Sequence, residues 1–167
     1  MNIDDSIITT VKLLLYESNK EHVLSAISKE RNPNILHIFA YNYNWDDGFE
    51  IPRALLENGF CELATALMIF YLANGYTYIT EKADNHECSE WSVFMKKLYT
   101  DITTGRYKTG NIAFSAPLTK IQIYKLAKLL DEQEHIFISN IEGENILRWQ
   151  NNGIINQDLH QQRNAKR

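Results

Sequence analysis

The stretch from Leu63 to Ala73 limits the fold of this chain more than any other. It has no charged side chain, and only Thr65 gives it a polar position among Leu, Ala, Met, Ile, Phe and Tyr. A helix needs about 20 apolar residues to cross a bilayer, so this stretch is too short to do so. A helix that is apolar on all sides is buried in protein instead. The sequence therefore predicts a central core helix, ended by Asn74-Gly75.

Apolar residues recur at helical spacing through most of the remaining chain, between residues that begin and end helices. We expect helices over Asp4–Glu17, from Asn19 to Arg31, from Pro33 to Tyr43, in a short segment opened by Pro52, over Glu90–Thr103 with Ser89 as cap, and after Pro117. Short connections between them predict a mainly α fold, either a multi-helix bundle or stacked helical hairpins. No fixed sequence period supports true repeats.

Two features suggest structure other than helix. Tyr76–Thr80 is aromatic and β-branched, which favours an extended turn. His135–Ile141 alternates apolar and polar residues and is expected to pair with Asn111–Ala116 as one small β element in the C-terminal third. The composition becomes polar near the end, so we expect a single domain over residues 1–155 and a flexible tail over 156–167.

Charge is distributed in blocks although the formal net charge is only −4. Residues 45–62 carry −4, 81–90 carry −3, 91–130 carry +6 and 131–144 carry −5. Met1–Ser6 holds Asp4 and Asp5 where a signal peptide would be basic, so we expect a cytoplasmic protein. Cys61 and Cys88 lack the spacing of a disulfide framework, which agrees with reduced thiols.

The segment W-D-D-G-F-E-I-P, from Trp45 to Pro52, is dense in aromatic and acidic residues. Its carboxylates could do acid–base chemistry or bind magnesium. Turn chemistry accounts for the same residues: an aspartate caps the helix near Pro52, the glycine adopts a backbone angle closed to other residues, and Trp45 and Phe49 pack on the core. We therefore interpret this motif as structural, through Trp45, Asp46, Asp47, Gly48 and Pro52.

Signals for catalysis are weak. His86-Glu87-Cys88 gives one possible ligand pair, whereas a zinc site needs about four ligands with matched spacing. The phosphate-loop, dinucleotide, zinc-protease and serine-hydrolase motifs are all missing from the sequence. We predict no catalytic residue, no cofactor and no metal ligand, and so not an enzyme. A small enzyme that uses Asp46, Asp47 and Glu50 is kept as an alternative.

The run from Leu36 to Tyr78 contains W-D-D-G-F-x-x-P and A-L-x-x-F-Y-x-A-x-G and resembles a bacterial domain of unknown function, number 4274 in its series. Such domains recur among presumed immunity proteins of polymorphic-toxin and contact-dependent growth inhibition systems. The resemblance implies an antitoxin that binds and blocks a cognate toxin domain. It also implies that the shared motif serves the fold and that the specific interface lies elsewhere.

We therefore expect an immunity protein that forms a heterodimer with its toxin, a basic nuclease, with neither membrane nor nucleic acid as partner. Acidic side chains would attract the toxin and buried aromatic rings would anchor it. The predicted toxin-binding residues are Tyr76, Tyr78, Glu81, Asp84, Glu87, Glu90, Asp131, Glu132, Glu134, Glu142 and Glu144. The alternative is a helical adaptor that binds RNA or a ribonucleoprotein through the basic 91–130 face.

Overall fold

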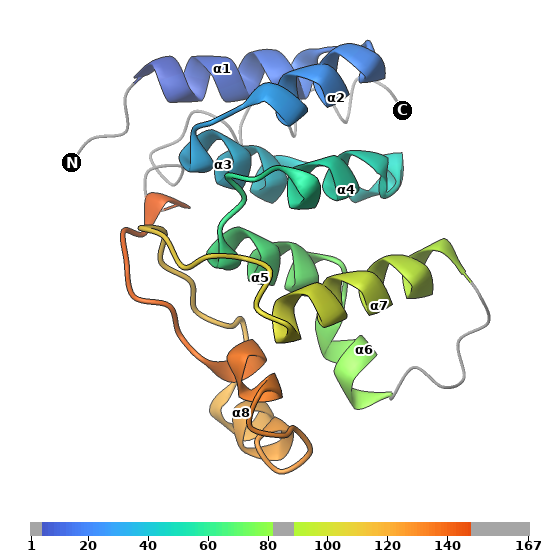
Figure 1. Ribbon diagram of the computed structural model, residues 1–167, viewed down its shortest axis with the longest axis vertical. Coiled ribbons are helices and arrows are strands. Elements are labelled where there is room, and N and C mark those ends of the chain that lie inside the picture. The colour runs from blue at the N-terminus through green and yellow to red at the C-terminus, as the bar shows by residue number, and fades with distance from the viewer. Residues whose placement is uncertain (1–4, 82–88, 148–167) are drawn as a thin grey trace.

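The computed structural model describes residues 5–81 and 89–147, so the predicted tail over 156–167 and the domain end at 155 lie outside the described residues. Figure 1 shows helices stacked in layers along the long axis. From one end to the other they are α1 (Asp5–Tyr16) with α2 (Lys20–Lys29), α3 (Pro33–Asn42) with α4 (Glu50–Glu57), α5 (Leu63–Leu72) with α7 (Glu90–Thr103), and α8 (Lys120–Leu126). Shorter elements are η1 (Trp45–Asp47), α6 (Gly75–Thr80) and η3 (Glu134–Ile138).

Successive layers pack directly on one another, α1 on α3, α2 on α4 and α3 on α5, and within the third layer α5 packs on α7. The mainly α prediction is thereby confirmed, and the layered order is that of stacked helical pairs (Figure 1). In the described part of the chain, none of the helices combines the length and apolar character needed to span a membrane.

Helix starts follow the local signals in the sequence. The Asn32 side chain accepts a hydrogen bond from the Asn34 amide at 3.0 Å, and Pro33 occupies the first turn of α3. Ser89 caps α7 through the Ser92 amide at 3.1 Å. Thr119, rather than Pro117, caps α8, and it forms a reciprocal capping box with Gln122. Each cap satisfies amide groups that the first helical turn leaves without a partner.

Helix α5 is the centre of the core, as its composition predicts. Every residue from Leu63 to Phe70 is buried. Its one buried hydroxyl, on Thr65, lies 2.9 Å from Nδ1 of the equally buried His37 on α3. Burial lowers the pKa of His37 from 6.5 to about 4, so the imidazole is neutral inside the core.

The prediction of an extended turn over Tyr76–Thr80 is wrong, because these residues lie in helix α6. Asn74 adopts the left-handed conformation with φ of 67°, and α6 begins at the next residue. A side chain at Gly75 would place its Cβ 2.2 Å from the Phe70 ring. The close approach of α6 to α5 therefore depends on glycine. Tertiary packing here outweighs the β-propensity of the segment.

The predicted strand over His135–Ile141 is also wrong. Glu134–Ile138 forms the 3-10 helix η3, which begins where the Glu134 amide donates to the Asp131 side chain at 2.9 Å. The small β element exists as two isolated bridges, Ile112 with Glu144 and Phe114 with Ile141. Asn111–Ala116 therefore pairs with Ile141, the last residue of the predicted partner strand, and with Glu144, which follows that strand.

The aromatic side chains of the W-D-D-G-F segment pack against α7, but two details of the prediction for this motif are wrong. Gly48 has φ of 86°, and the rings of Trp45 and Phe49 lie 6.4 Å and 4.7 Å from that of Phe94 on α7. Asp46 and Asp47 belong to η1 and do not cap α4, whose N-cap is Phe49 without a side-chain hydrogen bond. Helix α4 starts at Glu50, so Pro52 lies inside its first turn rather than opening it.

Candidate functional site

The structure brings together predicted residues from two distant segments. Tyr78 on α6 and Glu134 on η3 both line a small cavity of about 120 Å³, together with Tyr99 of α7 and Leu129 and Leu130 after α8. We call these five residues the acidic recess. The Tyr78 and Tyr99 rings lie 5.4 Å apart, and the Tyr99 hydroxyl donates to the Glu134 carboxylate at 2.5 Å.

The carboxylate of Glu134 is held in place from two sides. Besides Tyr99, it accepts a hydrogen bond from the Asp131 amide at 2.9 Å, while the Asp131 side chain accepts from the Glu134 amide. Burial, followed by the bond to Glu134, raises the pKa of Tyr99, so this hydroxyl stays protonated and keeps donating. The recess thus presents a fixed carboxylate beside aromatic and aliphatic side chains.

The surroundings of the acidic recess are exposed. Asp131 and Glu132 lie on the surface, and the Leu129 side chain is 57% exposed although it is aliphatic. Exposed apolar side chains rimmed by charge are typical of protein interaction sites. The recess can therefore receive an apolar side chain that lies next to a cationic group. Glu134 would pair with the cationic group, and because its side chain is already held in place, the pairing would cost little further conformational entropy.

The other predicted toxin-binding residues lie in different surroundings. Glu90 pairs with Arg53 at 2.9 Å and is nine residues before Tyr99, roughly 13 Å along the axis of α7. The Glu144 backbone bonds to Asn111 and Ala113 in the bridge region, with Glu142 exposed beside it. Tyr76 is half-buried on α6, and Glu81 is exposed at its end. Asp84 and Glu87 lie outside the described residues.

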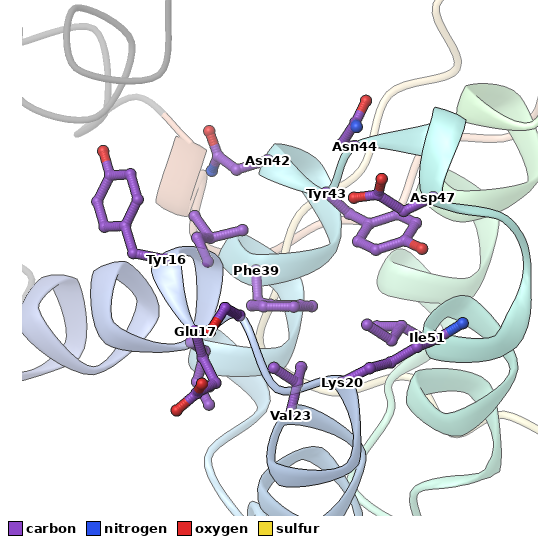
Figure 2. Close-up of a pocket in the computed structure, with 13 residues that line it drawn as sticks. Tyr16, Glu17, Lys20, Val23, Phe39, Asn42, Tyr43, Asn44, Asp47 and Ile51 are labelled. Carbon is purple, nitrogen blue, oxygen red and sulfur yellow. The ribbon is translucent and has the colours of Figure 1, made fainter. Parts of the chain in front are cut away.

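A larger cavity, of about 640 Å³, was not predicted from the sequence. It opens between the α1–α2 turn, the end of α3 and the start of α4, and we call it the hairpin cavity. Figure 2 shows side chains from these elements surrounding it. Its floor is apolar and includes the buried residues Val23, Phe39, Tyr43 and Ile51, while its rim includes Glu17, Lys20, Asn44 and Asp47.

The rim of the hairpin cavity is acidic on balance. The Asn19 amide donates to Glu17 at 2.8 Å, and this bond lowers the pKa of that carboxyl. Lys20 forms an ion pair with Glu50, so its charge is already matched. The Tyr43 hydroxyl donates to the Gly48 carbonyl at 2.9 Å, and burial raises the pKa of Tyr43 to about 12. Tyr43 therefore faces the cavity as a neutral ring.

No local signal in the sequence marks the hairpin cavity. Glu17 and Asp47 are thirty residues apart and converge because α1 packs on α3. Asp47 was interpreted as a turn residue, with a role in a small enzyme kept as the alternative. The acidic block over residues 45–62 was the one feature of the sequence that set this region apart.

Metal and thiol chemistry find little support in the part of the chain that the structure describes. Over residues 5–81 and 89–147, His, Cys, Asp and Glu side chains form no group of three suited to a metal ion. Cys61 is buried, and this burial raises the pKa of its thiol to about 12. The thiol is therefore protonated at neutral pH and a poor nucleophile.

The comparisons with known proteins confirm the resemblance inferred from the motifs. Residues 31–103 match the family model described as Domain of unknown function (DUF4274). This range runs from the start of α3 to the end of α7 and includes Tyr78 and Tyr99 of the acidic recess. A search of curated proteins and a search of solved structures each found no match to the chain.

Proposed function

We propose that this chain is a cytoplasmic immunity protein that binds and neutralises a cognate toxin domain. The toxin would belong to a contact-dependent growth inhibition or polymorphic-toxin system. Residues 31–103 of the chain match the DUF4274 family model. The observation that carries this proposal is the acidic recess, where a fixed carboxylate and an apolar floor open beside exposed Leu129. The resemblance to presumed immunity proteins supports the choice of a toxin as partner.

The toxin that suits this surface is a nuclease, because nucleases bind phosphates through lysine and arginine side chains. Asp131 and Glu132, exposed beside the recess, would speed its approach and orient it. A lysine or arginine of the toxin would then pair with Glu134. An apolar neighbour of that residue would contact Leu129 and Leu130. Occupation of this cationic surface would exclude the nucleic-acid substrate.

Helix α8 widens the contact surface. Ile121 and Tyr124 are 68% and 63% exposed, although both are large apolar side chains. They lie three residues apart and therefore on one face of the helix. Large exposed side chains of this kind provide most of the affinity in protein interfaces when a partner covers them. We expect the toxin to extend from the acidic recess onto this face.

A matched pair of leucine variants tests the proposal. Leu129→Asp places a charge at the acidic recess, and Leu13→Asp makes the same change on α1, at a residue that is 69% exposed against 57% for Leu129. The toxin domain encoded beside this gene would be purified and its Kd measured for each variant. Loss of one anchor costs about 2 kcal/mol, roughly thirty-fold in Kd. We expect this loss for Leu129→Asp alone, and equal affinities for both variants would refute the placement of the interface.

Binding of RNA by α8 is the second candidate function. Lys128 lies 4.1 Å from the centre of the exposed Tyr124 ring, and Lys120 and Lys125 are exposed nearby, so cations surround a ring on which a base could stack. The acidic residues that follow the helix oppose a polyanion, which makes this the weaker candidate. A fluorescent single-stranded RNA would decide it. Binding that weakens steeply with salt and is lost in a Lys125→Glu, Lys128→Glu variant would favour this function.

A further inference from the structure

Helix α8 lies at one end of the stack of helices, and its outer face is apolar as well as basic. Figure 1 shows it at the end of the molecule opposite α1 and α2. Leu126 is buried against the body, whereas Ile121 and Tyr124 are 68% and 63% exposed and Lys125 is exposed beside them. The last layer of a helical stack normally has a polar outer face, because no further layer covers it. A surface that covered α8 would remove these two apolar side chains from water, which is favourable.

The charges around α8 indicate what kind of surface could cover it. Residues 117–134 divide into a basic half followed by an acidic half, with three lysines in the first and three carboxylates in the second. These residues are Lys120, Lys125 and Lys128, and Asp131, Glu132 and Glu134. The exposed Leu129 lies between the two halves. Such a surface is complementary to a copy of itself turned by 180°, because each basic half then lies over an acidic half.

The acidic recess has room for one side chain of such a copy. Its volume of about 120 Å³ is well below the roughly 300–1,000 Å³ of pockets that bind small molecules. It presents the fixed carboxylate of Glu134 beside Leu129 and Leu130, so it suits an aliphatic side chain with a cation next to it. Ile121 and Lys125 form such a pair, because they lie four residues apart on the exposed face of α8.

We propose that the free protein forms a two-fold dimer in which Ile121 of each copy enters the acidic recess of the other. Lys125 of one copy then faces Glu132 and Glu134 of the second copy. The inference rests on the proposed function in one respect, because a toxin bound at the same recess must displace the second copy. The dimer keeps the apolar face of α8 covered until a toxin is present. Since only separated chains can bind the toxin, the apparent affinity for toxin is reduced where the dimer is populated.

Sedimentation velocity of the full chain without toxin tests the dimer. Over a series of increasing protein concentrations, we expect a species of twice the 19.5 kDa mass of one chain to become dominant. A single species with the mass of one chain at every concentration would overturn the proposal. Assemblies that keep growing beyond two chains would contradict a closed two-fold contact.

A matched pair of variants tests the apolar anchor. Ile121→Asp and Leu13→Asp make the same kind of change at side chains that are 68% and 69% exposed, so neither disturbs the core. Ile121→Asp should raise the dissociation constant of the dimer by roughly a hundredfold or more, because it removes an anchor from both halves of the contact. Leu13→Asp should leave that constant unchanged. Equal dissociation constants for the two variants would refute the insertion of Ile121.

Two charge reversals at exposed residues test the pairing itself. Lys125→Glu and Glu132→Lys each bring like charges together across the contact, so each variant alone should sediment as a single chain. An equimolar mixture of the two variants places opposite charges together again on both sides of the two-fold axis. The mixture should therefore restore the dimer, which variants that had lost their fold could not do. A mixture that stays monomeric while the wild type dimerises would contradict this pairing.

Addition of the toxin domain separates this inference from the proposed function. The wild-type chain and the toxin should sediment as a complex of one copy of each, without remaining dimer. A complex that holds two chains and a toxin would overturn the shared use of the recess. A wild-type chain that is monomeric yet binds the toxin would refute the dimer alone, and a dimer that ignores the toxin would refute the proposed function alone.

Discussion

The buried histidine of α3 makes the stability of the fold depend on pH in a defined way. His37 has a pKa of about 4 in the folded protein, against an ordinary value of 6.5, because burial disfavours the charged imidazole. Below pH 6.5 the unfolded chain therefore binds a proton that the folded chain does not. The contribution of neutral His37 to the free energy of unfolding is therefore fully present above pH 6.5. It decreases as the pH falls from 6.5 toward 4, and it changes no further below pH 4.

The shift from 6.5 to about 4 corresponds to roughly 3 kcal/mol, since one pKa unit is worth 1.36 kcal/mol. His37→Gln keeps a polar group that can bond to Thr65 but does not titrate. Urea unfolding of both proteins at pH 7, 6, 5 and 4 isolates the contribution of this residue from that of the carboxylates. The stability advantage of the wild type should decrease by about 3 kcal/mol across this range.

A control and a refuting result are both available. His135→Gln makes the same substitution at an exposed histidine of η3 and is the control for the change of residue type itself. If the difference between wild type and His37→Gln were the same at pH 7 and pH 4, the buried neutral imidazole would be refuted.

Three further predictions concern the backbone, a polar contact and a thiol. Gly48→Ala should cost about 1–3 kcal/mol in urea unfolding because of its positive φ, whereas Gly59→Ala, where the structure also leaves room for a Cβ, should stay within about 1 kcal/mol of wild type. Asn58→Ala should cost about 2–3 kcal/mol, because its side chain donates to the Ile27 and Glu30 carbonyls and accepts from the Phe60 amide; an unchanged unfolding midpoint would contradict this. In a Cys88→Ser background, Cys61 should react with a disulfide reagent at pH 8 only after unfolding, and fast reaction of the folded protein would show that the thiol is not buried.

Much of the fold could be predicted from the sequence because helix boundaries are local. Asn19, Asn32 and Ser89 cap helices through amides two or three residues ahead, and proline restricts its own neighbours. The buried run of α5 was equally visible, since its composition leaves it no exposed face. These features depend on residues within a turn or two of one another.

The errors arose where distant residues decide the conformation. Tyr76–Thr80 is helical because Gly75 allows α6 to approach Phe70 and because Tyr78 packs against Trp91 and Tyr99 from α7. The alternating pattern of His135–Ile141 hid the pair of Asp131 and Glu134 that starts η3. A capping signal of this kind is readable in the sequence and should have outweighed an imperfect alternation.

Of the candidate site, the sequence indicated single residues but not their assembly. Tyr78 and Glu134 were both predicted, yet Tyr99, which joins them, was placed with the basic segment. The hairpin cavity depends on four helices and on the turn between two of them, so no window of the sequence could reveal it.

Titration of toxin activity with the purified protein tests the central claim most directly. If the chain neutralises a nuclease by covering its substrate-binding surface, cleavage should fall in proportion to added protein and stop at one chain per toxin. The Leu129→Asp variant should need a large excess to do the same, because its anchor at the acidic recess is lost. Cleavage that continues unchanged in a large excess of the wild-type chain would contradict the claim.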